Sequence, residues 1–132
     1  MWLDSIEDST DIKQIYGRDP ILNDIVLYNL SIDYANNSVG LDIDFFDWPV
    51  PLPKDWYIDQ YTCLSLKVNF KDVFFNNVNL GKECIKYNIN IESTEENSIR
   101  IRISDNEGYC FYDFIAKSAK VVNFTFWDHR ND

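Results

Sequence analysis

Hydrophobic and polar residues alternate with a period of two along most of the chain, which predicts strands rather than helices. In residues 84–92, isoleucine and tyrosine alternate with lysine and asparagine, and residues 99–104 repeat the pattern with isoleucine against arginine and serine. Successive side chains of a strand point to opposite faces, so each segment has one apolar and one polar face. We expect the two segments to pair as an antiparallel hairpin around the polar loop of residues 93–98.

The same period predicts strands in the rest of the chain. Their apolar positions are Val26, Tyr28, Leu30 and Ile32; Val39, Leu41, Ile43 and Phe45; Leu64, Leu66, Val68 and Phe70; and Val122, Phe124 and Phe126. Asn36 and Asn37 predict a tight turn between the first two of these strands, because asparagine tolerates positive φ. We expect a further short strand at residues 73–80 and a central strand at residues 109–116, the latter being apolar in both phases apart from Asp113.

One short helix is predicted near the start of the chain. Ser9 is a suitable N-cap, and Ile12, Ile15 and Tyr16 share one face at helical spacing. Gly17 and Pro20 then mark the end of the helix.

One helix and about seven or eight strands favour an α+β fold that is mostly β, with a meander or sandwich-like antiparallel sheet. The length of 132 residues predicts a single domain over residues 1–132. The N-terminal residues have no basic leader or apolar stretch, and no later segment approaches the roughly 20 apolar residues of a membrane span. We therefore expect a cytoplasmic protein.

Three prolines within residues 49–53 predict a long irregular loop between the two halves of the chain. Trp48, Trp56 and Tyr57 flank these prolines. Exposed tryptophan and tyrosine could form a sugar-stacking platform or a protein-binding hot spot. Packing of the loop onto the sheet is an equally good interpretation.

The chain carries 22 acidic and 12 basic residues, a formal charge of −10, which opposes binding to nucleic acid or to an anionic membrane. Residues 1–59 hold 12 acidic and 3 basic residues, a net charge of −9. Residues 60–132 hold 10 and 9, a net charge of −1. This asymmetry predicts either an ordinary solvated surface or an acidic surface that faces a cationic partner.

Candidate catalytic groups are few. His129 is the only histidine and lies near the C-terminus, and none of the four glycines neighbours another, which excludes a glycine-rich phosphate loop. Cys63, Cys84 and Cys110 are odd in number and widely spaced, so we interpret them as free thiols rather than disulfide or zinc ligands. We expect neither an enzyme nor a cofactor.

The best candidate for chemistry is the pair Asp42 and Asp44, which are two residues apart on a predicted strand and share one face. Two carboxylates there could bind a divalent cation or act as an acid and base pair. The alternative is that they form the solvent face of a strand whose other phase is buried. The alternation around them favours this second interpretation.

Several landmarks together resemble the bacterial immunity protein 50 family of polymorphic toxin systems. They are a short helix ending at residues 15–17, Pro20 before an apolar strand, a paired strand rich in aspartate, a Pro-x-x-Trp element at residues 53–56, and alternating strands to the C-terminus. The resemblance implies a small cytoplasmic protein that binds a toxin domain and blocks self-intoxication. It brings no active-site residues with it.

The leading hypothesis is therefore a protein that binds a cognate toxin through an acidic surface, a cationic nuclease being one candidate partner. The predicted partner-binding residues are Asp33, Asp42, Asp44, Asp47, Trp48, Trp56 and Tyr57. The alternatives are a small β-rich module that binds a carbohydrate or another ligand, and a metal-dependent hydrolase built on the aspartate pair.

Overall fold

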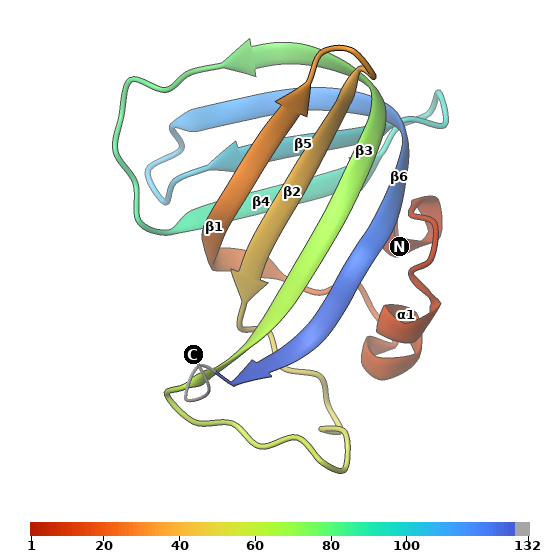
Figure 1. Cartoon of the computed structure of the whole chain (residues 1–132), viewed down its shortest axis with the longest axis vertical. Helices are drawn as coiled ribbons and strands as arrows, with labels where there is room; N and C mark the ends of the chain where they lie inside the picture. The colour runs from red at the N-terminus through yellow and green to blue at the C-terminus, as the bar shows by residue number, and fades with distance from the viewer. Residues whose placement is uncertain (129–132) are drawn as a thin grey trace.

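The computed structural model describes residues 1–128, in which six strands form a closed barrel (Figure 1). The helical elements are the 3-10 turn η1 (Trp2–Ser5) and the helix α1 (Thr10–Tyr16). The strands are β1 (Leu22–Asp33), β2 (Ser38–Phe45), β3 (Thr62–Val78), β4 (Tyr87–Ser93), β5 (Ile99–Ser104) and β6 (Cys110–Asp128). The expectation of a mostly β fold with one short helix is confirmed.

Two three-stranded meanders make up the barrel. β1, β2 and β3 pair in chain order, as do β4, β5 and β6, and the two sets join where β3 pairs with β6 and β1 pairs with β4. All of these pairings are antiparallel. In Figure 1, β1, β2, β3 and β6 lie side by side across the near face, with β4 and β5 behind them. The predicted antiparallel meander therefore closes on itself.

The barrel has six strands rather than seven or eight, because β3 and β6 each span two predicted segments. β3 contains the apolar segment that begins at Leu64 and most of the segment predicted at residues 73–80. β6 joins the segments predicted at residues 109–116 and 121–127. Asp72 has a φ of 55°, yet the ladder between β3 and β6 continues past it. Pairing along the ladder holds each strand together through its irregular residues.

β-Bulges change which side chains face the core. Tyr28 and Val122 were expected at core positions, but they are 60% and 57% exposed. They are the extra residues at register shifts in the β1–β2 and β3–β6 ladders respectively. An extra residue moves the side chains that follow it to the other face of the strand. Ile85 is also exposed, because β4 begins only at Tyr87.

The predicted helix is present as α1, and it buries Ile12 and Tyr16 in the core. Ser9 occupies the N-cap position, but its hydroxyl donates to the carbonyl oxygen of Leu3 at 2.8 Å rather than to the helix. Gly17 ends the helix in the left-handed conformation, with a φ of 66°. Glycine adopts this conformation without the steric penalty of a side chain.

Aromatic side chains contribute much of the buried core. Phe45, Phe70 and Phe114 are fully buried, and the rings of Phe70 and Phe114 meet edge-on with centroids 5.4 Å apart. Phe70 belongs to β3 and Phe114 to β6, so this contact joins the two meanders. Tilted or edge-on ring pairs add to the stabilisation from burial alone.

We expect Phe70→Ala to lower the free energy of unfolding by about 3 to 5 kcal/mol, because it removes a buried ring and leaves a cavity. Phe74→Ala on the same strand is the matched control, since Phe74 is 69% exposed. Urea denaturation followed by tryptophan fluorescence measures both variants. Similar losses of stability would contradict the placement of these two rings.

Asp47 lies just after the end of β2, and its hydrogen bonds hold the segment after α1 against this part of the chain. Its carboxylate accepts two hydrogen bonds from the guanidinium of Arg18, at 2.5 and 3.0 Å, and one from the N–H of Ile21 at 2.7 Å. Its backbone carbonyl accepts a further hydrogen bond from the hydroxyl of Tyr16 at 2.7 Å. Partial burial acts to raise the pKa of Asp47, but the hydrogen bonds from Arg18 and Ile21 outweigh it, so the pKa lies below its usual range.

A carboxylate with a lowered pKa stabilises the folded state at neutral pH and loses this effect as the pH falls through that pKa. We expect Asp47→Asn to lower the free energy of unfolding by about 1 to 2 kcal/mol at pH 7. The difference from the unmodified protein should shrink from about pH 5 downward. Asp55→Asn, at an exposed position in the proline-rich loop, is the control. A pH-independent difference in urea midpoint would contradict this role for the carboxylate.

Candidate functional site

A hollow of about 380 Å³ lies on the outer face of the barrel, across β1, β2, β3 and β6. Its principal side chains are Tyr28 from β1, Asp42 and Asp44 from β2, Lys67 from β3, and Thr125 and Trp127 from β6. These are the four strands on the near face in Figure 1. The hollow brings together residues from both halves of the sequence.

The alternation of β2 explains why both aspartates face outward. Ile43 and Phe45 are fully buried in the core, so Asp42 and Asp44 project from the opposite face. The two aspartates nevertheless differ, because Asp44 is only 5% exposed and accepts a hydrogen bond from the hydroxyl of Ser65 at 2.6 Å. Asp44 therefore belongs to the floor of the hollow and Asp42 to its accessible part.

The electrostatics of the hollow combine both signs of charge. The ammonium of Lys67 lies 4.0 Å from a carboxylate oxygen of Asp42, and the two residues are directly opposite each other in the β2–β3 ladder. Both side chains remain accessible, with exposed fractions of 52% and 37%. Exposed ion pairs of this kind contribute little to stability, so these charges are available for a partner at low cost.

Two exposed aromatic side chains of the hollow were missed by sequence reasoning. Tyr28 was assigned to the core phase, and the bulge that turns it outward has no evident signal in the alternation. Trp127 could have been found, because Phe124 and Phe126 in the inward phase place Thr125 and Trp127 in the outward one. Tyrosine and tryptophan supply large contact areas at low cost in side-chain entropy.

The aromatic residues of the proline-rich loop gather around Phe126 near the end of β6. The ring centroids of Trp48, Trp56 and Tyr57 lie 6.0, 5.2 and 5.9 Å from that of Phe126. The hydroxyl of Tyr57 also donates to a carboxylate oxygen of Asp128 at 2.6 Å. The loop is therefore packed onto the sheet, although Tyr57 remains 48% exposed.

The seven predicted partner-binding residues do not form one surface. Asp33 lies in the β1–β2 hairpin, at the opposite end of the barrel from the proline-rich loop (Figure 1). Its carboxylate accepts hydrogen bonds from the side chain and N–H of Asn36 and from the N–H of Ala35, which lower its pKa. Asp33 therefore stabilises its own turn, as Asp47 stabilises the segment after α1. Asp42 and Asp44 are the pair that the hollow unites.

Folding also redistributes the charge asymmetry of the sequence. Acidic side chains from the first half pair with basic ones from the second, as in Asp8 with Lys120 at 3.5 Å and Asp42 with Lys67. Asp4 pairs with Lys13 at 3.1 Å within the first half. These ion pairs offset part of the net charge of −9 over residues 1–59.

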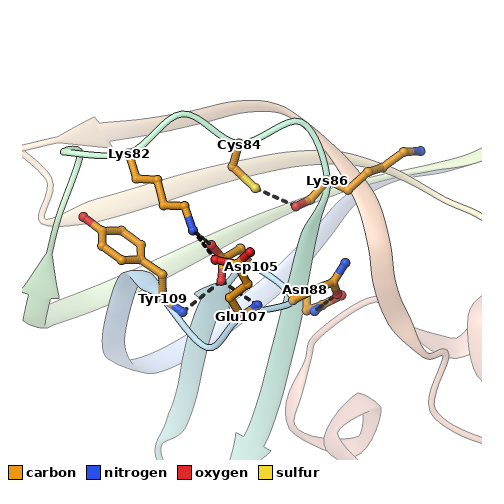
Figure 2. Close-up of polar contacts among 8 residues, drawn as sticks. Lys82, Cys84, Lys86, Asn88, Asp105, Glu107 and Tyr109 are labelled. Carbon is orange, nitrogen blue, oxygen red and sulfur yellow. Dashed lines mark hydrogen bonds and ion pairs between the residues drawn. The ribbon is translucent and has the colours of Figure 1, made fainter.

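A second cluster lies where the β3–β4 loop crosses the β5–β6 turn (Figure 2). The ammonium of Lys82 lies 2.5 Å from Asp105 and 3.0 Å from Glu107, and Asp105 also accepts the N–H groups of Glu107 and Tyr109 at 2.9 Å. The hydrogen bond that the Lys82 ammonium donates to Asp105 is the largest cause that raises the pKa of Lys82, and the same bond lowers the pKa of Asp105. Both side chains are held in their charged forms. The cluster is therefore an ion pair that holds the β3–β4 loop against the β5–β6 turn, rather than a general acid or base with a pKa near neutral pH.

Residues 1–128 contain the three cysteines of the chain. That part of the chain contains no group of three or more histidine, cysteine, aspartate or glutamate side chains arranged to hold a metal ion. Cys63, Cys84 and Cys110 form no disulfide, as expected, and the thiol of Cys84 donates to the carbonyl oxygen of Lys86 at 2.7 Å (Figure 2). His129 lies outside the described residues. No helix in the described part is long and apolar enough to cross a membrane.

Comparison with known proteins identifies one family. The model of the immunity protein 50 family matches residues 8–126, which include α1, all of β1 to β5 and most of β6. No curated protein and no solved structure matches the chain. The match covers most of the sequence and confirms the resemblance seen in its landmarks. The chain belongs to the immunity protein 50 family.

Proposed function

We propose that the protein is a cytoplasmic immunity protein that binds a cognate bacterial toxin domain and neutralises it by stoichiometric association. The family match over residues 8–126 is the observation that carries this proposal. The ion pairs of Arg18 with Asp47 and of Lys82 with Asp105 hold the fold together, so we assign these groups a structural role.

The hollow on β1, β2, β3 and β6 is the proposed contact surface. Tyr28 and Trp127 supply accessible aromatic area, and Asp42 supplies an accessible carboxylate beside them. Protein-binding hot spots combine such aromatic anchors with a few charged groups. The hydrogen bond that Asp44 accepts from the hydroxyl of Ser65 keeps the floor of the hollow fixed.

A cationic partner fits this protein better than an anionic one. The net charge of −10 attracts a positively charged domain over distances longer than any single contact. Complementary charge accelerates encounter and fixes orientation more than it raises affinity. A nuclease toxin, which needs positive charge for its own substrate, is therefore the partner class we favour.

We expect Asp42→Lys and Trp127→Ala each to raise the dissociation constant for the toxin domain by at least about tenfold, equivalent to about 1.4 kcal/mol. The test is isothermal titration calorimetry, which measures the affinity of each variant for the catalytically inactivated domain of the toxin that the proposal expects to be encoded next to this protein. Glu95→Lys in the β4–β5 loop matches the charge change, and Phe74→Ala, at an exposed ring on β3, matches the loss of an aromatic.

Equal effects of the test and control variants would remove the hollow from the binding surface while leaving the immunity function in place. Absence of any association with the toxin domain would instead contradict the proposed function. Urea denaturation of all four variants separates a loss of contact from a loss of folding.

The second candidate function is that of a β-rich module that binds a carbohydrate or a small ligand. The volume of the hollow, about 380 Å³, and its two exposed aromatic rings favour this alternative. It predicts that sugars quench tryptophan fluorescence in the absence of a protein partner and that Trp127→Ala abolishes the quenching. A glycan panel with no effect on fluorescence counts against this function.

A further inference from the structure

One edge of β1 has no neighbouring strand over most of its length. β1 pairs with β2 through residues 26–33, but it pairs with β4 only at Leu22 and Ile25. Among the residues that the structure describes, no other strand pairs with β1. The barrel is therefore closed near the start of β1. Beyond Ile25, the edge of β1 that faces away from β2 is open.

A fixed irregularity marks the place where β1 separates from β4. Asp24 has a φ of 51° and lies within the register shift of the β1–β4 ladder. Its N–H donates to the side chain of Asn88 at 2.9 Å, and its carboxylate accepts a hydrogen bond from Asn106 at 3.1 Å. The chain preceding β4 is fastened to Asp105 by Lys82 and does not continue the ladder (Figure 2). These hydrogen bonds and this ion pair hold β1 and β4 apart beyond Ile25, so the open edge is a fixed feature of the fold.

The opening leaves apolar side chains of β1 incompletely covered. Leu30 and Ile32 pack against the core but are only partly buried. Their direct partners on β2, Leu41 and Val39, are 2% and 1% exposed. Residues that face each other across one ladder normally share a similar environment. This difference in exposure indicates that Leu30 and Ile32 lack cover on the side of β1 that faces away from β2.

The composition of β1 lacks the usual protection of an open edge. Natural proteins place lysine, proline, inward charges or β-bulges on such strands to prevent pairing with another chain, and of these β1 has the bulge at Tyr28. β1 contains no lysine, arginine or proline, and its only charged residues are Asp24 and Asp33, near its two ends. A second copy of this chain is a poor occupant, because each copy carries a net charge of −10. An extended segment that carries basic residues is complementary to this edge.

We propose that residues 26–33 of β1 accept an extended, basic segment of the toxin domain as an additional antiparallel or parallel strand. Main-chain hydrogen bonds to the open edge supply affinity, and alternate side chains supply specificity. The inward side chains of the added strand cover Leu30 and Ile32, while lysine or arginine near its ends faces Asp24 and Asp33. This inference rests on the proposed function and names how the partner is held.

Hydrogen exchange of the complex with the inactivated toxin domain tests this arrangement. We expect amide exchange within residues 26–33 to slow by at least tenfold when the complex forms. Ser31→Lys should weaken binding by at least tenfold, because it adds to the edge a cation that repels a basic strand. Ser31 is exposed and directly opposite Gly40, so the change leaves the hollow untouched.

Gln14→Lys, at an exposed position of α1, is the matched control for charge and should change affinity by less than twofold. A stable complex in which residues 26–33 gain no protection, or in which Ser31→Lys behaves like Gln14→Lys, overturns the β1 proposal and leaves the immunity function standing. Absence of a complex with the unmodified protein overturns both. Equal urea midpoints for the two variants exclude misfolding as the cause of a lost affinity.

Discussion

The pairing of β3 with β6 is the constraint on which the rest of the barrel depends. These strands belong to different meanders, and their ladder extends from Thr62 opposite Asp128 to Val78 opposite Tyr112. Pairing strands far apart in sequence costs loop-closure entropy before any contact stabilises it. Burial along the ladder, as where Phe70 lies opposite Ala119, offsets that cost. The rest of each meander can then pair around this seam, through short turns except for the long proline-rich loop between β2 and β3.

The two seams of the barrel are unequal, and this inequality follows from strand length. β4 has seven residues and β5 has six, whereas β3 has 17 and β6 has 19. Long strands on one side cannot be matched along their full length by short strands on the other. The β1–β4 seam therefore closes over only a few residues, and the excess length of β1 projects beyond it. An open edge is a geometric consequence of closing a ring with strands of such different lengths.

Alternation predicted most of the fold because it reports directly which face of a strand is buried. The buried phases of β2, the first half of β3 and β5 follow the sequence pattern residue by residue. The pattern could not predict strand continuity through Asp72, nor the bulge at Tyr28, because both depend on which strands become neighbours. For the same reason it identified Asp42 and Asp44 as outward-facing but did not distinguish the exposed one from the buried one.

Net charge is a poor guide to an interaction surface because the fold uses many charged side chains for its own assembly. Asp47 and Asp105 are each held by a cation and by backbone N–H groups, and Asp33 closes a turn. Such carboxylates are held in place by the protein, so they contribute to its long-range field and to contacts at fixed positions, but they do not reorganise around a partner. Short-range recognition is better served by groups that remain accessible on the surface. The groups that we propose for it are the accessible Asp42, the exposed aromatic rings beside it, and the backbone of β1 beyond Ile25.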